Sequence, residues 1–358
     1  MNILIRKIKE MFNNCKLSLH INSDEKNDVV HKDQLLKDNK YENVFTKLSS
    51  VKFGVEIEFQ VTKKDVNGED IVEEFKKSGV LFEQEVILGR GGKRHYQNWQ
   101  LMKETSCDWE IISPVLRNIS EDWEILERVC NVLQNSKYGI YVDDNCAIHI
   151  QIDRKSVLSC GQHYINLMNT YRYLEPLIYG ISAGENEVVS LKRVKRYAAT
   201  LAYADKELKC NLGCEDYLDN NIRGGNIDFV NNYYKTRLVG LNFMTGNTDY
   251  KTIEFRTFNG TLNPALIQFY LEFIFNIICA SVKKDDSKLP TIQFWEKNGE
   301  EYKYNKKYID KCIQILYPNE YIKKCILGIL GNSQYNISRV LFDALNGEYS
   351  KEDKKNFI

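Results

Sequence analysis

Acidic residues with a two-residue spacing stand out in the stretch V-K-F-G-V-E-I-E-F-Q at 51–60. Apolar and polar residues alternate there, which is the period of a β-strand that packs one face on a core. Glu56 and Glu58 then share the other face, roughly 7 Å apart at about 3.3 Å per residue. Two carboxylates this close are costly without a cation, and oxygen ligands suit Mg²⁺ or Mn²⁺. Taken alone, the stretch favours a simpler interpretation, a half-buried strand with its polar face in water.

Two later stretches carry polar residues at the same spacing. C-A-I-H-I-Q-I-D at 146–153 places His149 and Gln151 on one face of a strand. The third stretch is T-I-E-F-R-T-F at 252–258. On a regular strand its polar face would consist of Thr252, Glu254, Arg256 and Phe258. Carboxylates and imidazole bind cations, and a guanidinium offsets the charge of a phosphoryl group. If the three faces converge, they form a metal and phosphate site.

The rest of the pattern predicts strands interspersed with long helices, an α+β fold with a curved, mainly antiparallel sheet backed by helices. Further strands are predicted over 80–88, 96–103, 108–116 and 236–244. Helices are predicted over 3–17, 121–134, 163–181, 191–203 and 264–282, and a further helix follows the polar turn at 65–70 and ends at 77. The tail over 285–358 is predicted to be mostly helical. A basic turn at 89–94 and an irregular stretch at 210–234 separate these elements.

Composition narrows the class of protein. The 358 residues carry 43% apolar and 27% charged residues and a formal net charge of zero, which gives no electrostatic reason to expect nucleic acid or an anionic membrane as a partner. No run of 18 apolar residues and no signal peptide is recognised, so we expect a cytoplasmic protein without a membrane span. Ten cysteines without a C-x-x-C pair indicate free thiols.

Five stretches together resemble the amidoligase family, within the carboxylate–amine ligase superfamily of glutamine synthetase and γ-glutamylcysteine synthetase. They are F-G-V-E-I-E-F at 53–59, W-Q-L-M-K-E-T-S-C-D-W-E-I-I-S-P-V-L at 99–116, C-A-I-H-I-Q-I-D at 146–153, R-V-K-R-Y at 193–197 and T-I-E-F-R-T-F-N-G-T-L-N-P at 252–264. They follow the family's order over about 51–280. The resemblance implies an N-terminal extension over 1–48, a catalytic domain with a glutamine synthetase-like fold over 49–284, and a C-terminal helical region over 285–358 packed on it.

The resemblance also implies an ATP-dependent ligase with two or more Mg²⁺ ions, or Mn²⁺, inside the curved sheet, acting on an amino acid, a peptide, or a protein or cell-wall fragment. It implies four metal ligands: Glu56, Glu58, His149 and Glu254. It implies contacts to the nucleotide from Arg256, Gln151, Arg196 and Asn242, and substrate contacts from Ser106, Arg193 and Arg237. Arg256 would also act in catalysis, together with Lys103 and with Glu104 as the candidate base.

Two residues depart from the family pattern. Gln151 stands where the family usually has the second histidine of H-x-H, and an amide carries no charge and is a poor metal ligand. Glu104 stands where the family often has aspartate. Both departures leave room for altered activity.

Two other classes of protein remain open. A thiol-dependent acyl transferase would use Cys160 or Cys107 as nucleophile and His163 or His149 as base. A catalytically silent binding protein would keep the same scaffold, although it has no physical need for paired carboxylates facing one cavity.

Overall fold

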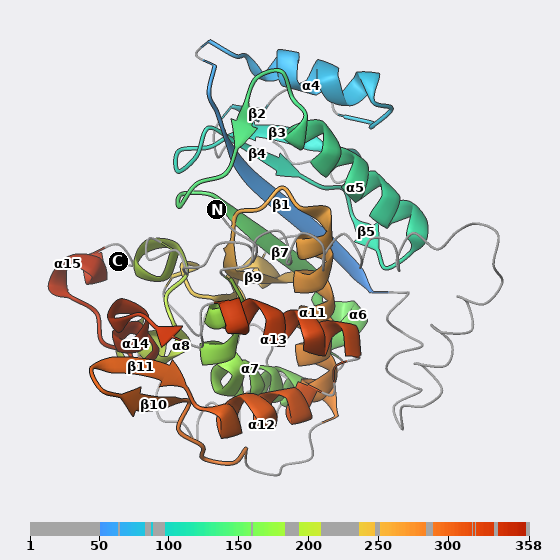
Figure 1. The fold of residues 1–358 in the computed structure, drawn as a ribbon. Coiled ribbons are helices and arrows are strands. Elements are labelled where there is room, and N and C mark those ends of the chain that lie inside the picture. The colour runs from blue at the N-terminus through green and yellow to red at the C-terminus, as the bar shows by residue number, and fades with distance from the viewer. Residues whose placement is uncertain are drawn as a thin grey trace.

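A computed structural model describes residues 51–63, 65–82, 87–88, 97–158, 160–182, 193–208, 236–247, 251–283, 289–316, 318, 320–332 and 336–355. The predicted extension over 1–48 with its helix, the basic turn at 89–94 and the irregular stretch at 210–234 lie outside the described residues. Within them the chain forms one large sheet with helices against it (Figure 1), which confirms the predicted α+β class with a mainly antiparallel sheet.

The sheet has nine strands in the described part of the chain, and the order of its main path is β2-β3-β4-β1-β7-β9-β8. Only β2 and β3 pair in parallel among these strands, and β5 and β6 pair with the two ends of β1. The bounds are β1 (Lys52–Val61), β2 (Ile87–Leu88), β3 (Gln100–Lys103), β4 (Trp109–Ile112), β5 (Leu116–Arg117), β6 (Ile140–Tyr141), β7 (Ala147–Asp153), β8 (Leu241–Asn242) and β9 (Thr252–Asn259).

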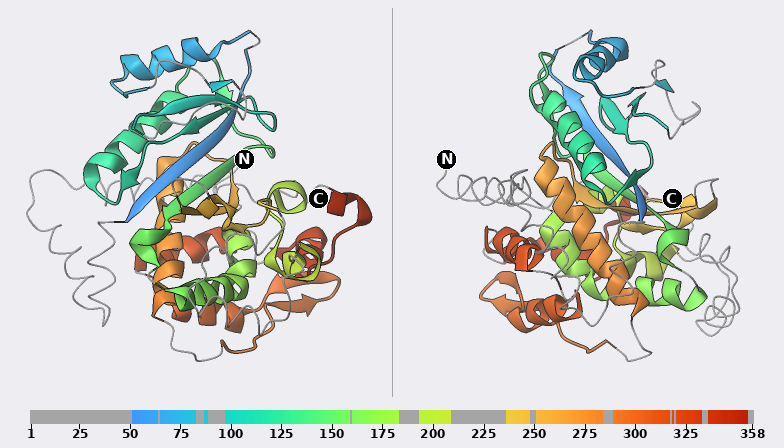
Figure 2. Two further views of the ribbon diagram at one scale, coloured as in Figure 1. Left: turned by 180° about the vertical axis from the view of Figure 1, so that it is seen from behind. Right: turned by 90° about the vertical axis from the view of Figure 1, so that its right-hand side faces the viewer.

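The helices cover the apolar face of this sheet. They are α4 (Gly68–Lys77), α5 (Ser120–Gln134), the short α6 (Arg154–Val157), α7 (Gly161–Ser182) and α11 (Pro264–Val282). Phe53 of β1 lies between α5 and α11, with its ring centroid 5.5 Å from that of Trp123 and 6.1 Å from that of Phe275. The alternation in β1 therefore divides the sheet as predicted, with apolar residues toward the helices and polar residues toward the other face. Figure 2 shows α5 and α11 side by side against the sheet.

Helix α11 is apolar and long enough to cross a membrane, yet 78% of its most apolar 18-residue window is buried inside the protein. It packs against α5 and α7 and against the C-terminal helices. Its composition is accounted for by its central place in the core.

The segment after α7 is irregular, where the sequence predicts a helix over 191–203. It consists of the π-helical turns η2 (Arg193–Tyr197) and η3 (Ala204–Leu208) around the short α8 (Leu201–Tyr203). A bridge between Ala199 and Val239 joins it to the chain before β8. The predicted strand over 236–244 is likewise shorter than expected, because Asn242 accepts a hydrogen bond from the backbone N–H of Met244 and the chain turns into η4 (Met244–Asn247).

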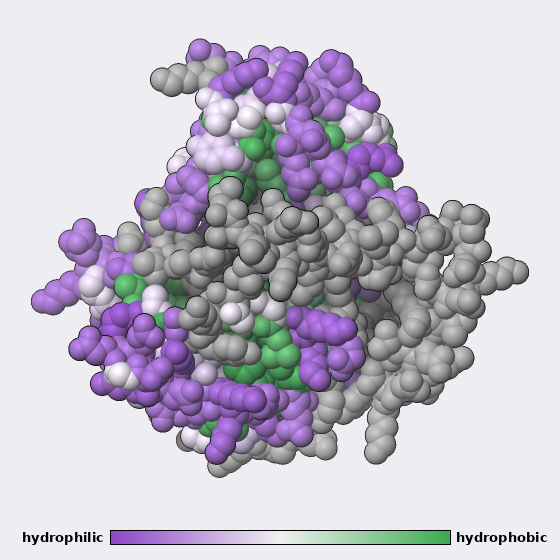
Figure 3. Space-filling model, in the orientation of Figure 1, coloured by the Kyte–Doolittle hydropathy of each residue, from purple (hydrophilic) through white to green (hydrophobic). Residues whose placement is uncertain are grey.

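The C-terminal region contains helices, which the sequence analysis predicted, and a small sheet, which it did not predict. The strands β10 (Trp295–Asn298), β11 (Glu301–Tyr304) and β12 (Asn336–Ile337) accompany α12 (Lys306–Leu316), α13 (Glu320–Asn332), α14 (Arg339–Leu345) and α15 (Lys351–Lys354). The hydroxyl of Tyr304 donates to the carbonyl of Pro176 in α7 at 2.8 Å. Most described residues at the surface seen in Figure 3 are hydrophilic, so the apolar residues are largely used in the core.

Candidate functional site

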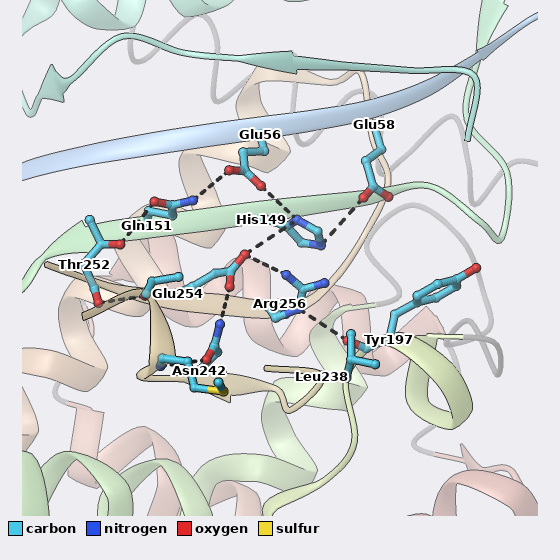
Figure 4. A network of polar contacts seen from close by, with 12 residues as sticks. Glu56, Glu58, His149, Gln151, Tyr197, Leu238, Asn242, Thr252, Glu254 and Arg256 are labelled. Carbon is cyan, nitrogen blue, oxygen red and sulfur yellow. Dashed lines mark hydrogen bonds and ion pairs between the residues drawn. The ribbon is translucent and has the colours of Figure 1, made fainter. Parts of the chain in front are cut away.

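Strand register brings the polar residues of four strands together on the face of the sheet away from the helices. Glu56 of β1 lies opposite His149 of β7, and Glu58 lies opposite Glu110 of β4. Gln151 of β7 lies opposite Glu254 of β9. Because cross-strand partners point to the same side of a sheet, these side chains converge. Figure 4 shows them as one network.

His149 is at the centre of this network. Its Nδ1 lies 3.1 Å from Glu56 Oε2, 3.9 Å from Glu254 Oε1 and 4.0 Å from an oxygen of Glu110, and its Nε2 lies 3.8 Å from Glu58 Oε1. All five side chains are buried. They form two groups that could each hold a metal ion and that share His149, namely Glu56, His149 and Glu254, and Glu58, Glu110 and His149. The four predicted metal ligands are therefore brought together.

The charges at this site call for cations. Four buried carboxylates face two buried arginines, Arg193 and Arg256, so negative charge is in excess. Oε2 of Glu58 is buried without a hydrogen-bond partner in the described structure, although a buried acceptor without a donor is costly. A divalent cation bound by carboxylate oxygens and an imidazole would remove both penalties, and this donor set fits Mg²⁺ or Mn²⁺.

Glu110 is a residue that the sequence analysis missed. It lies in D-W-E-I-I-S-P-V-L, which was identified as a strand but not as a source of ligands. The signal was its place directly opposite Glu58 in the β1–β4 pair, and that pairing cannot be read from either strand alone.

Two residues predicted to bind the nucleotide hold carboxylates in the structure. The Gln151 amide donates to Glu56 Oε1 at 2.7 Å and accepts from the Thr252 hydroxyl at 3.1 Å. The Asn242 amide donates to Glu254 Oε2 at 2.6 Å. The carboxylates of Glu56 and Glu254 thus each have one oxygen near His149, and the other oxygen accepts a hydrogen bond from a side-chain amide. Gln151 and Asn242 act on the candidate ligands as orienting partners.

A β-bulge in β9 orients Arg256. Between the pairs Ile148–Phe258 and Ile150–Phe255, β9 contains one residue more than β7. The side chain of Arg256 stays on the site face, where its Nη1 donates to Glu254 Oε1 at 2.7 Å and its Nε donates to the carbonyl of Tyr197 at 3.4 Å.

The carboxylates around Arg256 stabilise its charge. Burial lowers the pKa of Arg256, but the carboxylates of Glu254, Glu58 and Glu56 raise it by more, so the pKa is raised overall.

The bulge also reverses which side chains of β9 face the site. The ring of Phe258 stacks on Tyr270 of α11, with centroids 4.2 Å apart. The prediction that Phe258 shares the polar face was therefore wrong.

Arg193 enters the site from η2 and is fully buried. Its Nη1 lies 3.5 Å from His149 Nε2, and its guanidinium lies over the Tyr197 ring, 5.2 Å from the centroid. Burial lowers its pKa, and the nearby Glu58 carboxylate opposes that shift. Sequence analysis predicted a substrate contact for Arg193, and the structure places it beside the candidate metal ligands.

Five other predicted residues make no hydrogen bond or ion pair with the carboxylate network among the described residues. Lys103 is exposed, with its ammonium 3.9 Å from Asp108 and 4.4 Å from the centroid of the Trp109 ring. The carboxylate of Glu104 accepts from the backbone N–H of Thr105 at 2.8 Å, within the β3–β4 loop. Ser106 is half-buried in the same loop, whereas Arg196 and Arg237 are exposed.

The thiols offer little support for a nucleophilic cysteine. Burial and the neighbouring Glu58 raise the pKa of Cys107 far above its ordinary value, and the reactive form of a cysteine is the thiolate. Cys160 is exposed, and its carbonyl accepts from the backbone N–H of His163 at the start of α7, which is a helix-end contact between main-chain atoms.

A buried asparagine extends the site along β9. Asn259 lies opposite Ala147, which shares the face of His149, so the Asn259 side chain belongs to the site face. Its Oδ1 is buried without a hydrogen-bond partner in the described structure. The bulge explains why period-two reasoning missed this residue.

Fold and site together define a buried polar centre on a mainly antiparallel sheet, with two candidate cation positions and two arginines. A family model described as "Putative amidoligase enzyme" matches residues 33–278, which is more than half of the 358 residues. The chain therefore belongs to the amidoligase family. No curated protein matches it.

Among solved structures, similarity is found to a bifunctional glutathione synthetase from Pasteurella multocida, with 10% identity, a TM-score of 0.34, and coverage of 88% of this chain and 50% of that one. Similarity is also found to the complex of the prokaryotic ubiquitin-like protein Pup and its ligase PafA, with 10% identity, a TM-score of 0.31, and coverage of 85% of this chain and 65% of that one. This chain thus spans less than two thirds of either.

Proposed function

We propose that this amidoligase is an ATP- and Mg²⁺-dependent carboxylate–amine ligase that joins an amino acid or peptide, free or within a protein or cell-wall fragment, through an amide or isopeptide bond. The observation that carries the proposal is the pair of buried three-ligand groups that share His149, beside two buried arginines.

The ligand sets suit two divalent cations. Glu56, His149 and Glu254 would hold one, and Glu58 and Glu110 would hold the other with His149 between them. Bound cations neutralise phosphate oxygens and increase the electrophilicity of a transferring phosphoryl group. Mn²⁺ has the same ligand preference and is the alternative.

The arginines suit the phosphate chain. Arg256 is held by Glu254 and by the carbonyl of Tyr197, so its position is fixed before any ligand arrives. Arg193 approaches from η2, and its Nη1 lies close to His149. Fixed positive groups in a dry site stabilise developing negative charge without reorganising. We assign Arg256 to the γ-phosphate and Arg193 to the phosphate or carboxylate next to it.

The reaction proceeds in two steps. A substrate carboxylate oxygen attacks the γ-phosphorus of ATP, the bond to the β-phosphate oxygen breaks, and ADP and an acylphosphate result. An amine then attacks the acyl carbon, inorganic phosphate leaves with the bonding electrons of the C–O bond, and an amide forms. The amine must lose a proton, and Glu104 in the β3–β4 loop is the proposed acceptor.

A coupled assay tests this function. ADP release is measured with Mg²⁺ and a panel of amino acids and peptides, offered singly and in acid–amine pairs. We expect release that requires both partners and falls by about 10²–10³ in Arg256→Lys, because lysine cannot reproduce the two-pronged contact. ADP release that is equal in Arg256→Lys and the wild type would contradict the assignment of Arg256.

A further inference from the structure

The segment that carries Arg193 is held in place by the end of the chain, outside the region that matches the family. We call residues 193–208 the arginine segment and residues 338–355 the C-terminal brace. Figure 1 shows α14 beside α8, although more than 130 residues separate them in sequence. Contacts of α14 with α8 and η2, and of α15 with η2, confirm the neighbourhood.

Tyr349 is the centre of the contact. Its hydroxyl accepts from the backbone N–H of Thr200 at 3.1 Å and donates to the carbonyl of Val194 at 3.2 Å. Val194 follows Arg193 directly. One hydroxyl therefore links the start of η2, which carries the Arg193 guanidinium, to Thr200 after its end. The ring of Tyr349 packs on that of Tyr203, with centroids 4.3 Å apart.

Other groups of the brace reinforce this contact. The Thr200 hydroxyl donates to the carbonyl of Ala344 at 2.7 Å, and the Lys206 ammonium donates to the carbonyl of Asn346 at 2.8 Å. Two ion pairs lie farther out, Lys195–Asp353 at 3.2 Å and Lys354–Glu207 at 2.8 Å.

Gly347 allows the close approach of the two segments. Its φ is +74°, which only glycine adopts readily, and a Cβ there would lie 2.9 Å from the carbonyl oxygen of Ala202. The backbone of the brace therefore packs directly on the backbone of α8 at this point.

We propose that the C-terminal brace fixes the arginine segment and that Tyr349 is a positioning residue for Arg193. The segment also supplies the Tyr197 carbonyl that holds Arg256, so both arginines of the site depend on it. Displacement of the brace would loosen phosphate binding and leave the carboxylates on β1, β4, β7 and β9 intact. The brace thereby makes anion binding depend on a part of the chain outside the family match. Its effect on nucleotide binding rests on the proposed function.

The test compares two tyrosine-to-phenylalanine variants. Tyr349→Phe removes the hydroxyl that ties Val194 to Thr200 and keeps the ring. Tyr308→Phe is the matched control, because Tyr308 is a buried tyrosine of the C-terminal region whose hydroxyl donates to the Tyr173 carbonyl at 2.7 Å, away from the arginine segment.

Hydrogen exchange of the amides at 194–200 is measured first, because it does not depend on any ligand. We expect exchange about tenfold faster in Tyr349→Phe and unchanged in Tyr308→Phe. Gly347→Ala, which disturbs the brace from another residue, should accelerate the same amides. Equal exchange in wild type and Tyr349→Phe, or equal acceleration in Tyr308→Phe, would overturn the proposal.

Binding of a non-hydrolysable ATP analogue with Mg²⁺ is measured second. We expect the Kd to rise about tenfold in Tyr349→Phe, with Mn²⁺ affinity in the absence of nucleotide unchanged. Faster exchange with an unaltered Kd would overturn the positioning role. A wild type that binds no nucleotide contradicts the proposed function instead, and the exchange result then decides on the brace alone.

Discussion

His149 Nδ1 lies 3.1 Å from Glu56 Oε2, and the two residues are direct cross-strand partners on β7 and β1. The imidazole of His149 links the two candidate cation positions, because it faces Glu254 through Nδ1 and Glu58 through Nε2. A buried histidine surrounded by four carboxylates is explained by cation binding better than by packing, and this relationship leads to the predictions below.

Removing one carboxylate should stabilise the metal-free protein and weaken metal binding. In Glu58→Gln the repulsion with Glu110 is lost, so we expect the free energy of unfolding in EDTA to rise by on the order of 1 kcal/mol. The added stability that Mg²⁺ or Mn²⁺ gives the wild type should fall, because a ligand is missing. Thermal unfolding with and without metal measures both effects. A variant that is destabilised in EDTA would show that Glu58 has a purely structural role.

Gln151 should act through Glu56. Gln151→Leu removes the amide that holds Glu56 Oε1 and leaves the Thr252 hydroxyl without its acceptor. We expect Mn²⁺ affinity to fall about 10–100-fold, as for other residues that orient metal ligands. Gln151→His keeps an N–H group that can still donate to Glu56, so it is the matched control and should lose less. Equal losses in the two variants, measured by calorimetry, would contradict an orienting role.

A negative charge at position 242 should destabilise the protein. Asn242→Asp replaces the donor to Glu254 Oε2 by a carboxylate at a buried contact of 2.6 Å. We expect a loss of about 2–4 kcal/mol in unfolding free energy without metal, because two buried carboxylates then face each other. Saturating Mn²⁺ should recover part of the loss. Urea unfolding with and without metal measures it, and a loss below about 0.5 kcal/mol would contradict the contact.

Glu175 should make stability depend on pH. Burial raises its pKa to about 8, against the hydrogen bonds from the backbone N–H groups of Leu201 and Ala202. A carboxyl whose pKa is raised on folding contributes stability below its unfolded pKa, near 4.5, and loses it as pH rises toward 8. Over this window we expect the wild type to lose stability, by on the order of 5 kcal/mol at most, relative to Glu175→Gln.

Urea unfolding of the wild type and Glu175→Gln at a series of pH values makes the comparison. Glutamine mimics the protonated carboxyl and can accept the same backbone bonds. Parallel stability curves for the two proteins between pH 4.5 and 8 would show that folding does not raise the pKa of Glu175.

The sequence predicted the regular parts of the fold because local patterns decide them. The alternation in 51–60 gave β1 and the assignment of its faces, and the apolar run after Pro264 gave α11 at its observed bounds. The strand faces of Glu56, His149 and Glu254 were also predicted, and the pairing of β1, β7 and β9 meets the condition that these faces converge.

Features set by distant contacts could not be predicted in this way. Glu110 joins the site through its register with Glu58, and the bulge that carries Arg256 and displaces Phe258 depends on the pairing of β9 with β7. The arginine segment has no regular period, and its shape depends on contacts with Tyr349 far along the chain.

Calorimetric titration of a non-hydrolysable ATP analogue, with and without Mg²⁺, into the wild type and Glu254→Gln tests the central claim most directly. Glu254 contacts His149, Asn242 and Arg256 together, so its charge is at the centre of the site. We expect Mg²⁺-dependent binding to the wild type and at least a tenfold weaker affinity in the variant. Absence of binding to the folded wild type with either Mg²⁺ or Mn²⁺ would contradict the ATP-dependent ligase mechanism.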